Sequence, residues 1–581
     1  MFKTLAASVR EYKGKSIASA VLVAFEVIME CLIPFVAAIL IKNIDEGCEL
    51  PVVIGWGMLL ILLAIISLTF GALAGRACAT ASCGFAKNLR HDLYARVQDF
   101  SFGNIDKFSS ASLVTRLTTD VANVQMAYMM LIRVAIRSPL MLVFALVMGF
   151  VMGGSMAVIF LAIVPILAFG LIMVIRLTMP LFRRVFRRYD KLNESIEENI
   201  IGARVVKSFV REDYENEKFD REAKSVCADF TKAEKILVFN GPLMQLCVYS
   251  VMVFTLYFGA RSIITNPLAG FDIGKLSALI TYGVQILISL MMLSMIFVML
   301  TISAESAVRV SEVLNEAPGV TSPEGAVMCV ENGDVVFENV TFRYAKAAER
   351  PALADINLSI RSGETVGILG GTGSSKSTLI QLISRLYDVS EGRVLVGGVD
   401  VRDYDLTVLR DSVAVVLQKN VLFSGTIREN LRWGDANATD EEIRAACRMA
   451  CADEFIEAFP EGYDTYIEQG GANVSGGQKQ RLCIARALLK KPKVLILDDS
   501  TSAVDTKTDA HIRAAFKSFI PETTKIIIAQ RVASVMEADK IILMDGGRIT
   551  AVGDHASLLR ESDVYREIYE SQCRTGEEVD A

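Results

Sequence analysis

Long apolar runs occupy roughly the first 300 residues, and they constrain the fold more than any other feature of the sequence. A bilayer core about 30 Å thick needs a helix of ~20 apolar residues to cross it. The run at 138–175 is long enough for most of two such helices, with a hinge at Gly153-Gly154-Ser155. Four further runs meet the requirement: 17–41, 52–75, 236–260 and 276–304. The sequence therefore predicts six membrane-spanning helices.

Basic residues are concentrated in particular connections between these runs. Lys and Arg gather at the N-terminus and within residues 76–125 and 176–235, whereas the connection 43–51 is acidic. Because positively charged connections stay on the cytoplasmic side, we expect the N-terminus and both long basic segments there. The sequence thus predicts a multi-pass protein of the cell (cytoplasmic) membrane, in contact with the lipid bilayer. A net charge of −6 gives no indication of a nucleic-acid partner.

The pattern changes after the apolar half, at the turn-rich residues 317–325. Short β-branched runs then alternate with amphipathic helical patterns, which is typical of an α/β domain with a mostly parallel sheet. We therefore expect an all-α transmembrane domain with two long cytoplasmic helical loops over 1–315, a linker over 316–332 and an α/β domain over 333–581. The predicted strands are 365–369, 413–417, 494–497, 525–529 and 540–544.

A glycine-rich loop follows the predicted strand 365–369 and opens a helix. Such a loop directs backbone N–H groups and a helix N-terminus toward phosphate, while Lys376 reaches the outer phosphates and Ser377 reaches Mg²⁺. Ser375 stands where the P-loop pattern has its last glycine, so this stretch by itself also fits a glycine-rich turn. The loop consists of Gly370, Gly371, Thr372, Gly373, Ser374, Ser375, Lys376, Ser377 and Thr378.

Two more motifs strengthen the phosphate-binding interpretation. Four apolar residues from Val494 lead to Asp498, as expected of a buried strand that delivers a carboxylate to Mg²⁺ at its carboxyl end. Between the loop and this strand, another helical pattern opens with Ser475, Gly476, Gly477 and Gln478.

With these motifs in this order, the chain resembles the ATP-binding cassette (ABC) transporter family, exporter type, over nearly all its length. The resemblance implies that the P-loop family fold of the second domain binds ATP and Mg²⁺, and that a second cassette chain is required. It also implies roles for single positions: Tyr344 stacks on adenine, Gln418 connects Mg²⁺ to the membrane domain, and Asp505, in Ser502-Ala503-Val504-Asp505, communicates across the cassette dimer. The segments 102–108 and 208–215 match the short elements that couple spans to cassettes.

Two catalytic positions depart from the family pattern. Asp499 stands where the family has the catalytic glutamate, and Gln530 stands where it has the switch histidine. The aspartate is shorter by one C–C bond, about 1.5 Å, and a misplacement of ~1 Å can cost ~10² in rate. With the signature intact, the chain resembles the degenerate-site subunit of a heterodimeric exporter, whose different partner chain has the consensus Glu and His.

Other interpretations of the chain stay open at this point. A slow symmetric homodimer fits, since an aspartate retains some base function. A lipid-moving or nucleotide-gated regulator, or an ATPase-silent scaffold that only completes a partner's site, also fits. The resemblance favours export of amphipathic drugs or lipids, that is, of a hydrophobic small molecule.

Charged and methionine side chains within the spans are candidate substrate contacts. Glu26 and Glu30 share one helix face, and Arg133 and Arg137 repeat that spacing at a similar depth. Ionisable groups in a membrane are costly, so these four either pair to fix helix packing or provide an acidic site for a cationic substrate. In the sixth span Met291, Met295 and Met299 form a stripe that fits either helix packing or the wall of an adaptable cavity.

Overall fold

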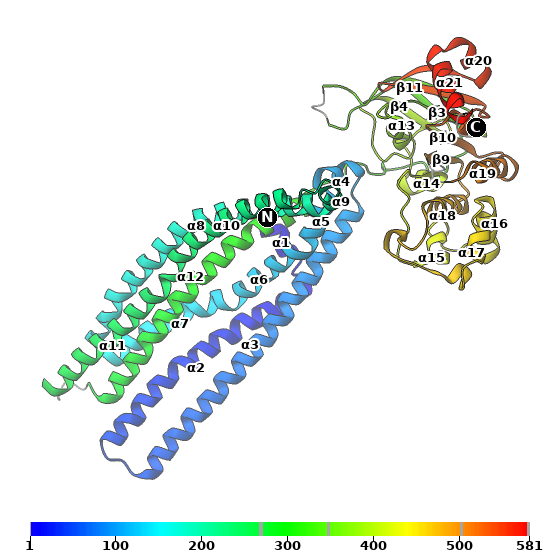
Figure 1. The fold of residues 1–581 in the computed structure, drawn as a ribbon. Helices are drawn as coiled ribbons and strands as arrows, with labels where there is room; N and C mark the ends of the chain where they lie inside the picture. The colour runs from blue at the N-terminus through cyan, green and yellow to red at the C-terminus, as the bar shows by residue number, and fades with distance from the viewer. Residues whose placement is uncertain (1, 266–270, 346–348, 500–503, 578–581) are drawn as a thin grey trace. The chain divides into compact units, whose positions relative to one another are not determined.

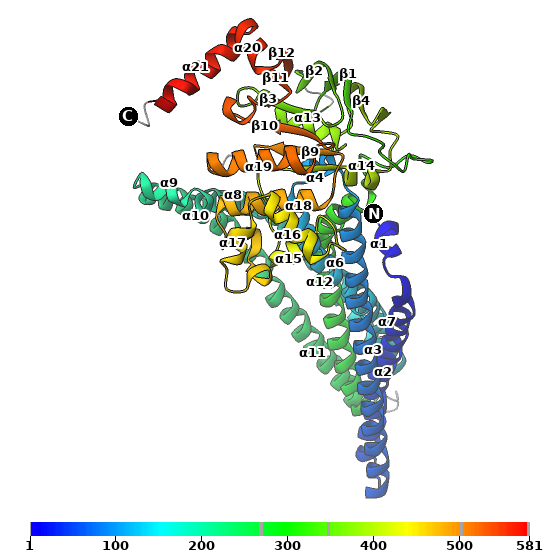
Figure 2. The ribbon, with the colours of Figure 1, turned by 90° about the vertical axis from the view of Figure 1, so that its right-hand side faces the viewer.

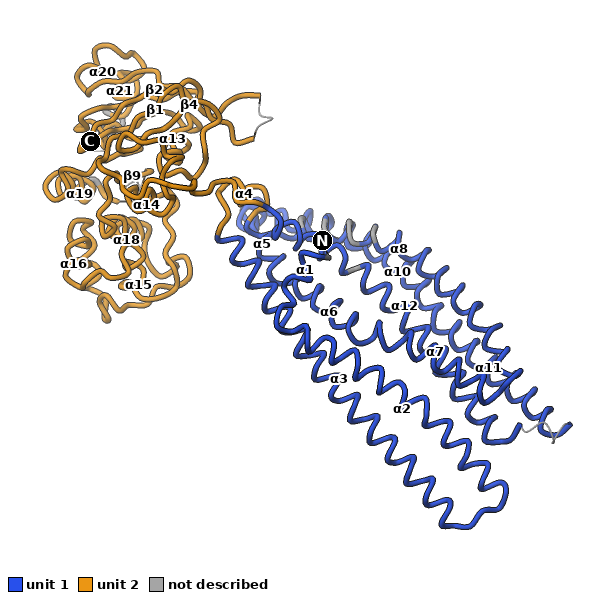
Figure 3. Tube along the Cα trace, turned by 180° about the vertical axis from the view of Figure 1, so that it is seen from behind, with its two compact units in different colours: residues 1–98, 110–316 blue, residues 99–109, 317–581 orange. Residues whose placement is uncertain are grey.

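The structure, a computed structural model, describes residues 2–265, 271–345, 349–499 and 504–577. Its internal contacts divide the chain into two compact units, which Figure 3 colours separately. The first unit comprises residues 1–98 and 110–316, and the second comprises residues 99–109 and 317–581. The predicted domain limits did not anticipate that the segment 99–109, which interrupts the first unit in the sequence, belongs with the second.

The first unit is entirely helical in its described residues. The two helices α2 and α3 run side by side and are joined by a short connection (Figure 1). The helices of this unit are α1 (Phe2–Ala7), η1 (Arg10–Tyr12), α2 (Lys13–Asp45), α3 (Leu50–Gln98), α5 (Ser110–Thr115), η2 (Arg116–Asp120), α6 (Val121–Ile132), α7 (Val134–Gly153), η3 (Gly154–Ala157), α8 (Val158–Ile201), α9 (Ala203–Ser208), α10 (Glu212–Val238), α11 (Asn240–Thr265) and α12 (Ile273–Asn315).

Six membrane spans follow from these helices, as predicted. Five continuous helical stretches among the described residues are long and apolar enough to cross a membrane, and one of them, Ser110–Phe182, has 73 residues. At 1.5 Å per residue that stretch would measure about 110 Å, more than three bilayer cores. It is broken at η3, where Gly154 has φ 50, a left-handed conformation that favours glycine. The break divides it into two spans at the predicted hinge.

Apolar side chains from several spans meet in the core of the first unit. Val23 and Val27 of α2, Phe160 of α8 and Tyr282 of α12 are among its fully buried members. The Tyr282 hydroxyl donates a hydrogen bond of 2.7 Å to the carbonyl oxygen of Cys31, so the one polar atom of this side chain is satisfied within the core.

The second unit contains three sheets. Six strands form the central sheet in the order β12-β11-β3-β10-β9-β6, parallel except for the β11–β12 pair. A four-stranded antiparallel sheet, β2-β1-β4-β5, and the short pair β7-β8 complete the set. The strands are β1 (Val335–Phe342), β2 (Leu353–Ile360), β3 (Thr365–Leu369), β4 (Glu391–Val396), β5 (Val399–Asp400), β6 (Val413–Val416), β7 (Gly425–Thr426), β8 (Tyr466–Ile467), β9 (Val494–Asp498), β10 (Thr524–Ile528), β11 (Lys540–Asp545) and β12 (Arg548–Gly553).

Helices cover both faces of the central sheet. Helices α15, α16, α18 and α19 pack on one face, and α13 with the antiparallel sheet packs on the other (Figure 2). The helices of this unit are α4 (Phe102–Phe108), α13 (Lys376–Ile383), α14 (Leu406–Ser412), α15 (Ile427–Leu431), α16 (Asp440–Met449), α17 (Asp453–Glu457), η5 (Gly462–Asp464), η6 (Gln469–Gly471), α18 (Gly476–Leu489), α19 (Thr506–Phe519), η7 (Val532–Ser534), α20 (His555–Glu561) and α21 (Asp563–Glu577).

The strand β9 explains why the central strands are continuous apolar runs. Val494 and Ile496 join the core on one face of the sheet, whereas Leu495 and Leu497 join the core on the other. Because side chains alternate across a strand, a strand covered on both faces has no polar side. The five predicted strands are all present, within one residue at each end. The antiparallel sheet was not predicted.

Candidate functional site

The sheet order brings four predicted site segments to one edge. The P-loop follows β3, Gln530 follows β10 after one residue, Asp499 follows β9, and Gln418 follows β6 after one residue. These strands are parallel neighbours, so their carboxyl ends meet at the same edge of the sheet. Ligands of open α/β sheets bind at that edge. We call these residues, together with Tyr344, the nucleotide edge.

The P-loop turns sharply between β3 and α13. Gly370 has φ 158 and Gly373 has φ 84, and a Cβ added at Gly370 would lie 2.2 Å from the carbonyl oxygen of Met544. Ser375 is also left-handed, with φ 67 and ψ 27, at the position where the pattern has glycine. This conformation costs a residue with a side chain about 1–2 kcal/mol. The loop therefore keeps its turn despite the substitution. Thr372 is exposed beside Gly373.

Lys376 begins α13 with its ammonium folded back over the loop. Its Nζ donates to the carbonyl oxygens of Gly370 and Gly371, both at 2.9 Å, and to the hydroxyl of Ser374 at 3.2 Å. Burial lowers the pKa of Lys376, and the charges of Asp498 and Asp499 oppose that shift. The ammonium thus lies at the mouth of the loop, beside two carboxylates.

Asp498 ends β9 as a buried carboxylate, 6 % exposed. Burial raises its pKa, and the neighbouring Asp499 adds to the rise, whereas the hydrogen bond from Ser377 and the charge of Lys376 oppose it. A carboxylate and a hydroxyl are oxygen ligands of the kind Mg²⁺ takes. Asp498 and Ser377 lie in contact, so the donor set fits Mg²⁺, and the loop fits the phosphates that the ion would accompany.

Asp499 is the meeting point of the two positions that depart from the family pattern. It has φ 48, and its backbone N–H donates to the carbonyl oxygen of Ile528 at 3.0 Å. Its Oδ2 accepts hydrogen bonds from Nε2 of Gln530 at 3.0 Å and from Nε2 of Gln418 at 3.2 Å. The sequence predicted the three positions separately, and the sheet places their side chains in direct contact.

Tyr344 lies just beyond β1, and its ring is 54 % exposed. Its hydroxyl is 2.9 Å from the hydroxyl of Thr378, the last P-loop residue. The ring packs edge-on against Tyr387, at 5.3 Å between centroids. Sequence reasoning did not single out Tyr387, whose hydroxyl donates to Oδ2 of Asp106 in α4 at 2.7 Å. An exposed aromatic ring joined to the P-loop suits stacking on a base.

The signature residues form the start of α18. Ser475 caps the helix: its hydroxyl accepts from the N–H of Gln478 at 3.3 Å, and its own N–H donates to Oε1 of Gln478 at 2.9 Å. This capping box satisfies two helix-terminal N–H groups by reciprocal bonds. Ser475 and Gly476 are exposed, and Gly477 is half-buried. The helix start is therefore rigid and accessible.

Asp505 is the N-cap residue of α19. Its Oδ1 accepts from the backbone N–H of Thr508 at 2.9 Å, and this hydrogen bond lowers the pKa of Asp505. The predicted communication loop begins at Ser502 and Ala503, which lie outside the described residues. The structure therefore positions the end of that loop and gives no account of its beginning.

The two predicted coupling elements differ in outcome. Residues 102–108 form the helix α4 of the second unit, and Nδ2 of Asn104 donates to the carbonyl oxygen of Ala317 at 3.0 Å. Residues 208–215 instead cover the end of α9, a turn and the start of α10. Val210, within this turn, has a left-handed φ of 52. The coupling role of both stays a prediction.

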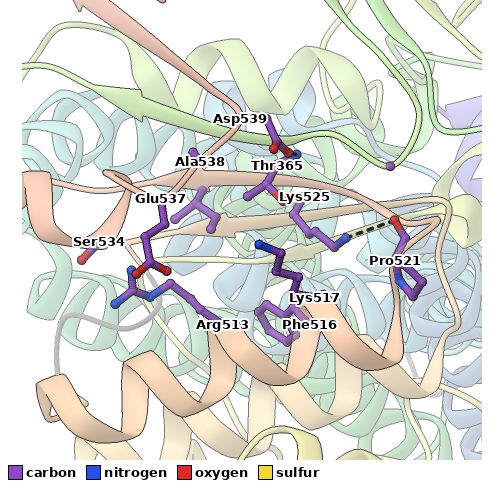
Figure 4. A pocket seen from close by; sticks show the side chains of 12 residues that line it. Thr365, Arg513, Phe516, Lys517, Pro521, Lys525, Ser534, Glu537, Ala538 and Asp539 are labelled. Atoms are coloured by element: carbon purple, nitrogen blue, oxygen red, sulfur yellow. Dashed lines mark hydrogen bonds between the residues drawn. The ribbon is translucent and has the colours of Figure 1, made fainter. Parts of the chain in front are cut away.

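Two hollows in the second unit lie outside the nucleotide edge. One, of about 400 Å³, has an aromatic wall where Phe423 and Trp433 stack with centroids 4.2 Å apart. The other, of about 200 Å³, lies between α19 and the sheet, and Arg513, Lys517 and Lys525 contribute to its lining (Figure 4). None of the described residues assigned above to the nucleotide edge lines the second hollow.

In the membrane unit, Arg137 contacts both glutamates of α2. Its Nη2 lies 2.7 Å from both carboxylate oxygens of Glu30 and 3.7 Å from Oε1 of Glu26. Arg133 instead packs over Gly75 of α3, one turn from Gly71, over which Glu26 packs. These contacts favour pairing for Arg137.

The methionine stripe keeps part of its surface free within this chain. Met295 is 53 % exposed, whereas Met291 and Met299 are half-buried. A substrate role for Met291, Met295 and Met299, and for Glu26 and Glu30, stays a prediction.

Comparisons with known proteins agree over both units. Residues 16–299 match the family described as ABC transporter transmembrane region, and residues 353–502 match the family described as ABC transporter. An uncharacterized ABC transporter ATP-binding protein of Bacillus subtilis (strain 168) is 36 % identical over 555 residues, 95 % of each chain. The ATP-dependent lipid A-core flippase of Desulfotalea psychrophila is 31 % identical over 487 residues, 84 % of each chain.

A solved structure extends the similarity to the whole fold. The structure of a bacterial Atm1-family ABC exporter with ATP bound superimposes with a TM-score of 0.81 at 24 % identity. The match covers 97 % of this chain and 99 % of that one. The helical unit with its six spans and the α/β unit therefore occur in the same order along the chain as in that protein.

Proposed function

The chain belongs to the ABC transporter family, and from that premise we propose that it is one half of an ATP-driven exporter whose second half is a different chain. The family is one of transport ATPases, and the exporter fold works in the membrane as a dimer. In the proposed dimer this chain supplies an ATP site that binds well and hydrolyses poorly. Its partner supplies the efficient site.

The arrangement around Asp499 carries the proposal. A carboxylate oxygen has about two acceptor positions, and Oδ2 of Asp499 already accepts from Gln530 and Gln418. A general base must accept a proton from the attacking water, so this oxygen is poorly prepared for that task. Gln530 is a neutral amide at every pH and cannot replace a histidine in proton chemistry. The two departures from the family pattern, Asp499 and Gln530, thus meet at one carboxylate oxygen, and both make it a weaker base.

The residues that bind nucleotide contrast with this. Lys376, Ser377 and Asp498 retain the groups that phosphate and Mg²⁺ need, and the exposed Tyr344 ring suits adenine. When bound, ATP and Mg²⁺ supply the interaction energy that closes two cassettes on each other. On the other side of the dimer, the rigid start of α18 with Ser475 and Gly477 would complete the partner's site.

The substrate class proposed is a hydrophobic or amphipathic compound, a drug or a lipid. The relative from Desulfotalea psychrophila is a lipid A-core flippase, which supports a lipid-like cargo. Met295, exposed within this chain, is a side chain that adapts to varied apolar ligands. The cassette and N-terminus are proposed to lie in the cytoplasm, in keeping with the basic connections.

A slow symmetric homodimer is the second candidate. It is favoured by one observation, that Asp499 retains a carboxylate within hydrogen-bonding distance of the switch position. A lipid-moving or nucleotide-gated regulator would share the nucleotide edge, and transport assays in liposomes separate it from a pump.

The test is the ATPase activity of the purified chain alone and together with a co-expressed half-transporter. The proposal expects activity only in the mixture, surviving Asp499→Asn but lost when the partner's catalytic Glu is changed to Gln. Hydrolysis by the lone chain, abolished by Asp499→Asn, would instead establish the homodimer.

A further inference from the structure

The last helix of the chain contacts the backbone next to the switch position. Oε1 of Gln572, in α21, accepts from the N–H of Val532 at 2.8 Å, and its Nε2 donates to the carbonyl oxygen of Gln530 at 3.0 Å. One amide side chain therefore bonds both polar groups that flank Arg531, as a neighbouring strand would. Such a two-point contact fixes the backbone between them. We call residues 530–532 the switch segment.

The helix that carries Gln572 is itself anchored. Tyr565 is fully buried, and its hydroxyl lies 2.7 Å from Nδ1 of His555 in α20. Ile568 and Tyr569 pack against the core on the same face of the sheet as α18 and α19. The positions 565, 568, 569 and 572 follow the spacing of one helix face. Gln572 is thus presented to the switch segment by a docked helix.

A second restraint reaches the chain just beyond the switch segment from α19. Nη1 of Arg513 donates to the carbonyl oxygen of Ala533 at 3.1 Å, and Nη2 lies 3.3 Å from Asp509. Figure 4 shows the Arg513 side chain extending from α19 toward the chain that carries Ser534 and Glu537. The backbone is therefore held at 533 by α19, and at 530 and 532 by α21.

Gln530 makes contacts in two directions, with Asp499 through its side chain and with α21 through its backbone. Its Nε2 donates to Oδ2 of Asp499, while its backbone oxygen accepts from Gln572. A shift of the switch segment would move the Gln530 amide relative to Asp499, because both contacts belong to one residue.

We propose that Gln572 is a positioning residue, which holds the switch segment so that the Gln530 side chain faces Asp499 and the nucleotide. The proposal rests on the proposed function, in which this chain's site binds ATP well, and adds that the Gln530 side chain helps to retain the nucleotide. Gln572 acts only through the switch segment and touches no nucleotide. Replacing Gln572 should therefore leave the P-loop folded as it is. The effect should be on how long ATP is retained at this chain's site.

The experiment uses the full chain in lipid nanodiscs, with its partner where one is known. Gln572→Ala removes both hydrogen bonds. Gln572→Glu keeps the acceptor for the Val532 N–H and loses the donor to the Gln530 carbonyl oxygen. Glu570→Ala, at an exposed position of the same helix, is the control. Hydrogen exchange of the Val532 amide reports the backbone contact directly. Retention of 8-azido-ATP, photocrosslinked to this chain after a chase, reports the site without requiring hydrolysis.

We expect Gln572→Ala to speed exchange at Val532 and shorten ATP retention, each about tenfold, the lower part of the range that the loss of two hydrogen bonds predicts. Gln572→Glu should fall between, and Glu570→Ala should match the parent. Gln530→Ala should shorten retention equally, and adding Gln572→Ala to it should shorten retention no further, because the two act as one unit.

Three results would overturn the proposal. Unchanged exchange at Val532 in Gln572→Ala would mean that the contact is not made in solution. Faster exchange with unchanged retention, while Gln530→Ala shortens retention, would mean that the contact does not position Gln530. If neither variant alters retention, Gln530 does not help to retain the nucleotide and the positioning role of Gln572 falls with it. That third result leaves the partner-dependent ATPase test untouched, so the two failures are distinguishable.

Discussion

Glu26 and Glu30 in the membrane unit and Asp498 and Asp499 in the cassette unit are both pairs of neighbouring acidic side chains with a basic side chain close by. The first pair has its counter-ion within the same chain, because the guanidinium of Arg137 contacts both glutamates. The second pair lies at the carboxyl edge of a sheet beside Lys376, whose ammonium bonds to loop oxygens rather than to either carboxylate.

The difference distinguishes acidic pairs that fix helix packing from acidic pairs that bind a ligand. Acidic groups in a membrane need a charged partner from the protein, because no water is present to stabilise them. At a sheet edge water is available, so a carboxylate can be left for a metal ion and a phosphate-bound ligand. The four predictions below test this contrast.

Restoring the family residues at the sheet edge should have the largest effect. Asp499→Glu combined with Gln530→His should raise hydrolysis at this chain's own site by about 10²–10⁴, the usual contribution of a positioned base. The rate is measured in a mixture whose partner carries Glu→Gln, so that only this site contributes. An unchanged rate would show that the two departures do not limit the site.

Removing the ammonium beside the second acidic pair should weaken nucleotide binding. Lys376→Ala should lower ATP affinity roughly 10- to 100-fold, because charge-assisted hydrogen bonds contribute about 1.5–3 kcal/mol. Equilibrium binding of a fluorescent ATP analogue measures this, with the exposed Lys419→Ala as control. Equal affinity in the two variants would contradict the assignment of the loop.

Removing the counter-ion of the first acidic pair should destabilise the membrane unit and leave the nucleotide affinity unchanged. Arg137→Met leaves both glutamates unpaired. A fully buried pair would lose about 3–5 kcal/mol, and since Arg137 is 40 % exposed we expect about 1–3 kcal/mol. Thermal unfolding in detergent measures it, and Arg261→Met, at an exposed position, is the control. Adding Glu30→Gln should recover part of the loss. A stable variant that no longer transports a cationic substrate would instead support the substrate role.

The smallest effect concerns the turn that positions Lys376. Ser375→Gly relieves a left-handed conformation worth about 1–2 kcal/mol, less the roughly 0.4–1 kcal/mol that glycine costs through the unfolded chain. A net gain of about 0.5–1 kcal/mol should appear in the cassette's unfolding transition. Ser518→Gly, inside α19, should lower stability instead. A loss at both positions would mean that the serine makes compensating contacts.

Local patterns predicted those parts of the molecule that local physics determines. The strand β9 is apolar from Val494 to Leu497 because both faces are covered, and Gly154 breaks a helix because only glycine takes its conformation readily. Such features leave a signal within a few residues.

Features that depend on distant segments were predicted incompletely or not at all. The contacts of Gln530 with Asp499 and with Gln572 span 31 and 42 residues, and only the sheet order and the docking of α21 determine them. The antiparallel sheet was missed because its strands, such as β2, are half polar on the exposed side, and because β1 also pairs with β4, which lies far along the chain.

The stacked pair of Phe423 and Trp433 makes the cassette observable by fluorescence. The chain has two tryptophans, and the other, Trp56, lies in α3 of the membrane unit. Replacing Trp56 with phenylalanine would leave Trp433 as a single emitter, 65 % exposed at the rim of the larger hollow. Its emission wavelength and quenching would then report, without any added label, whether the surroundings of that hollow change when ATP is added.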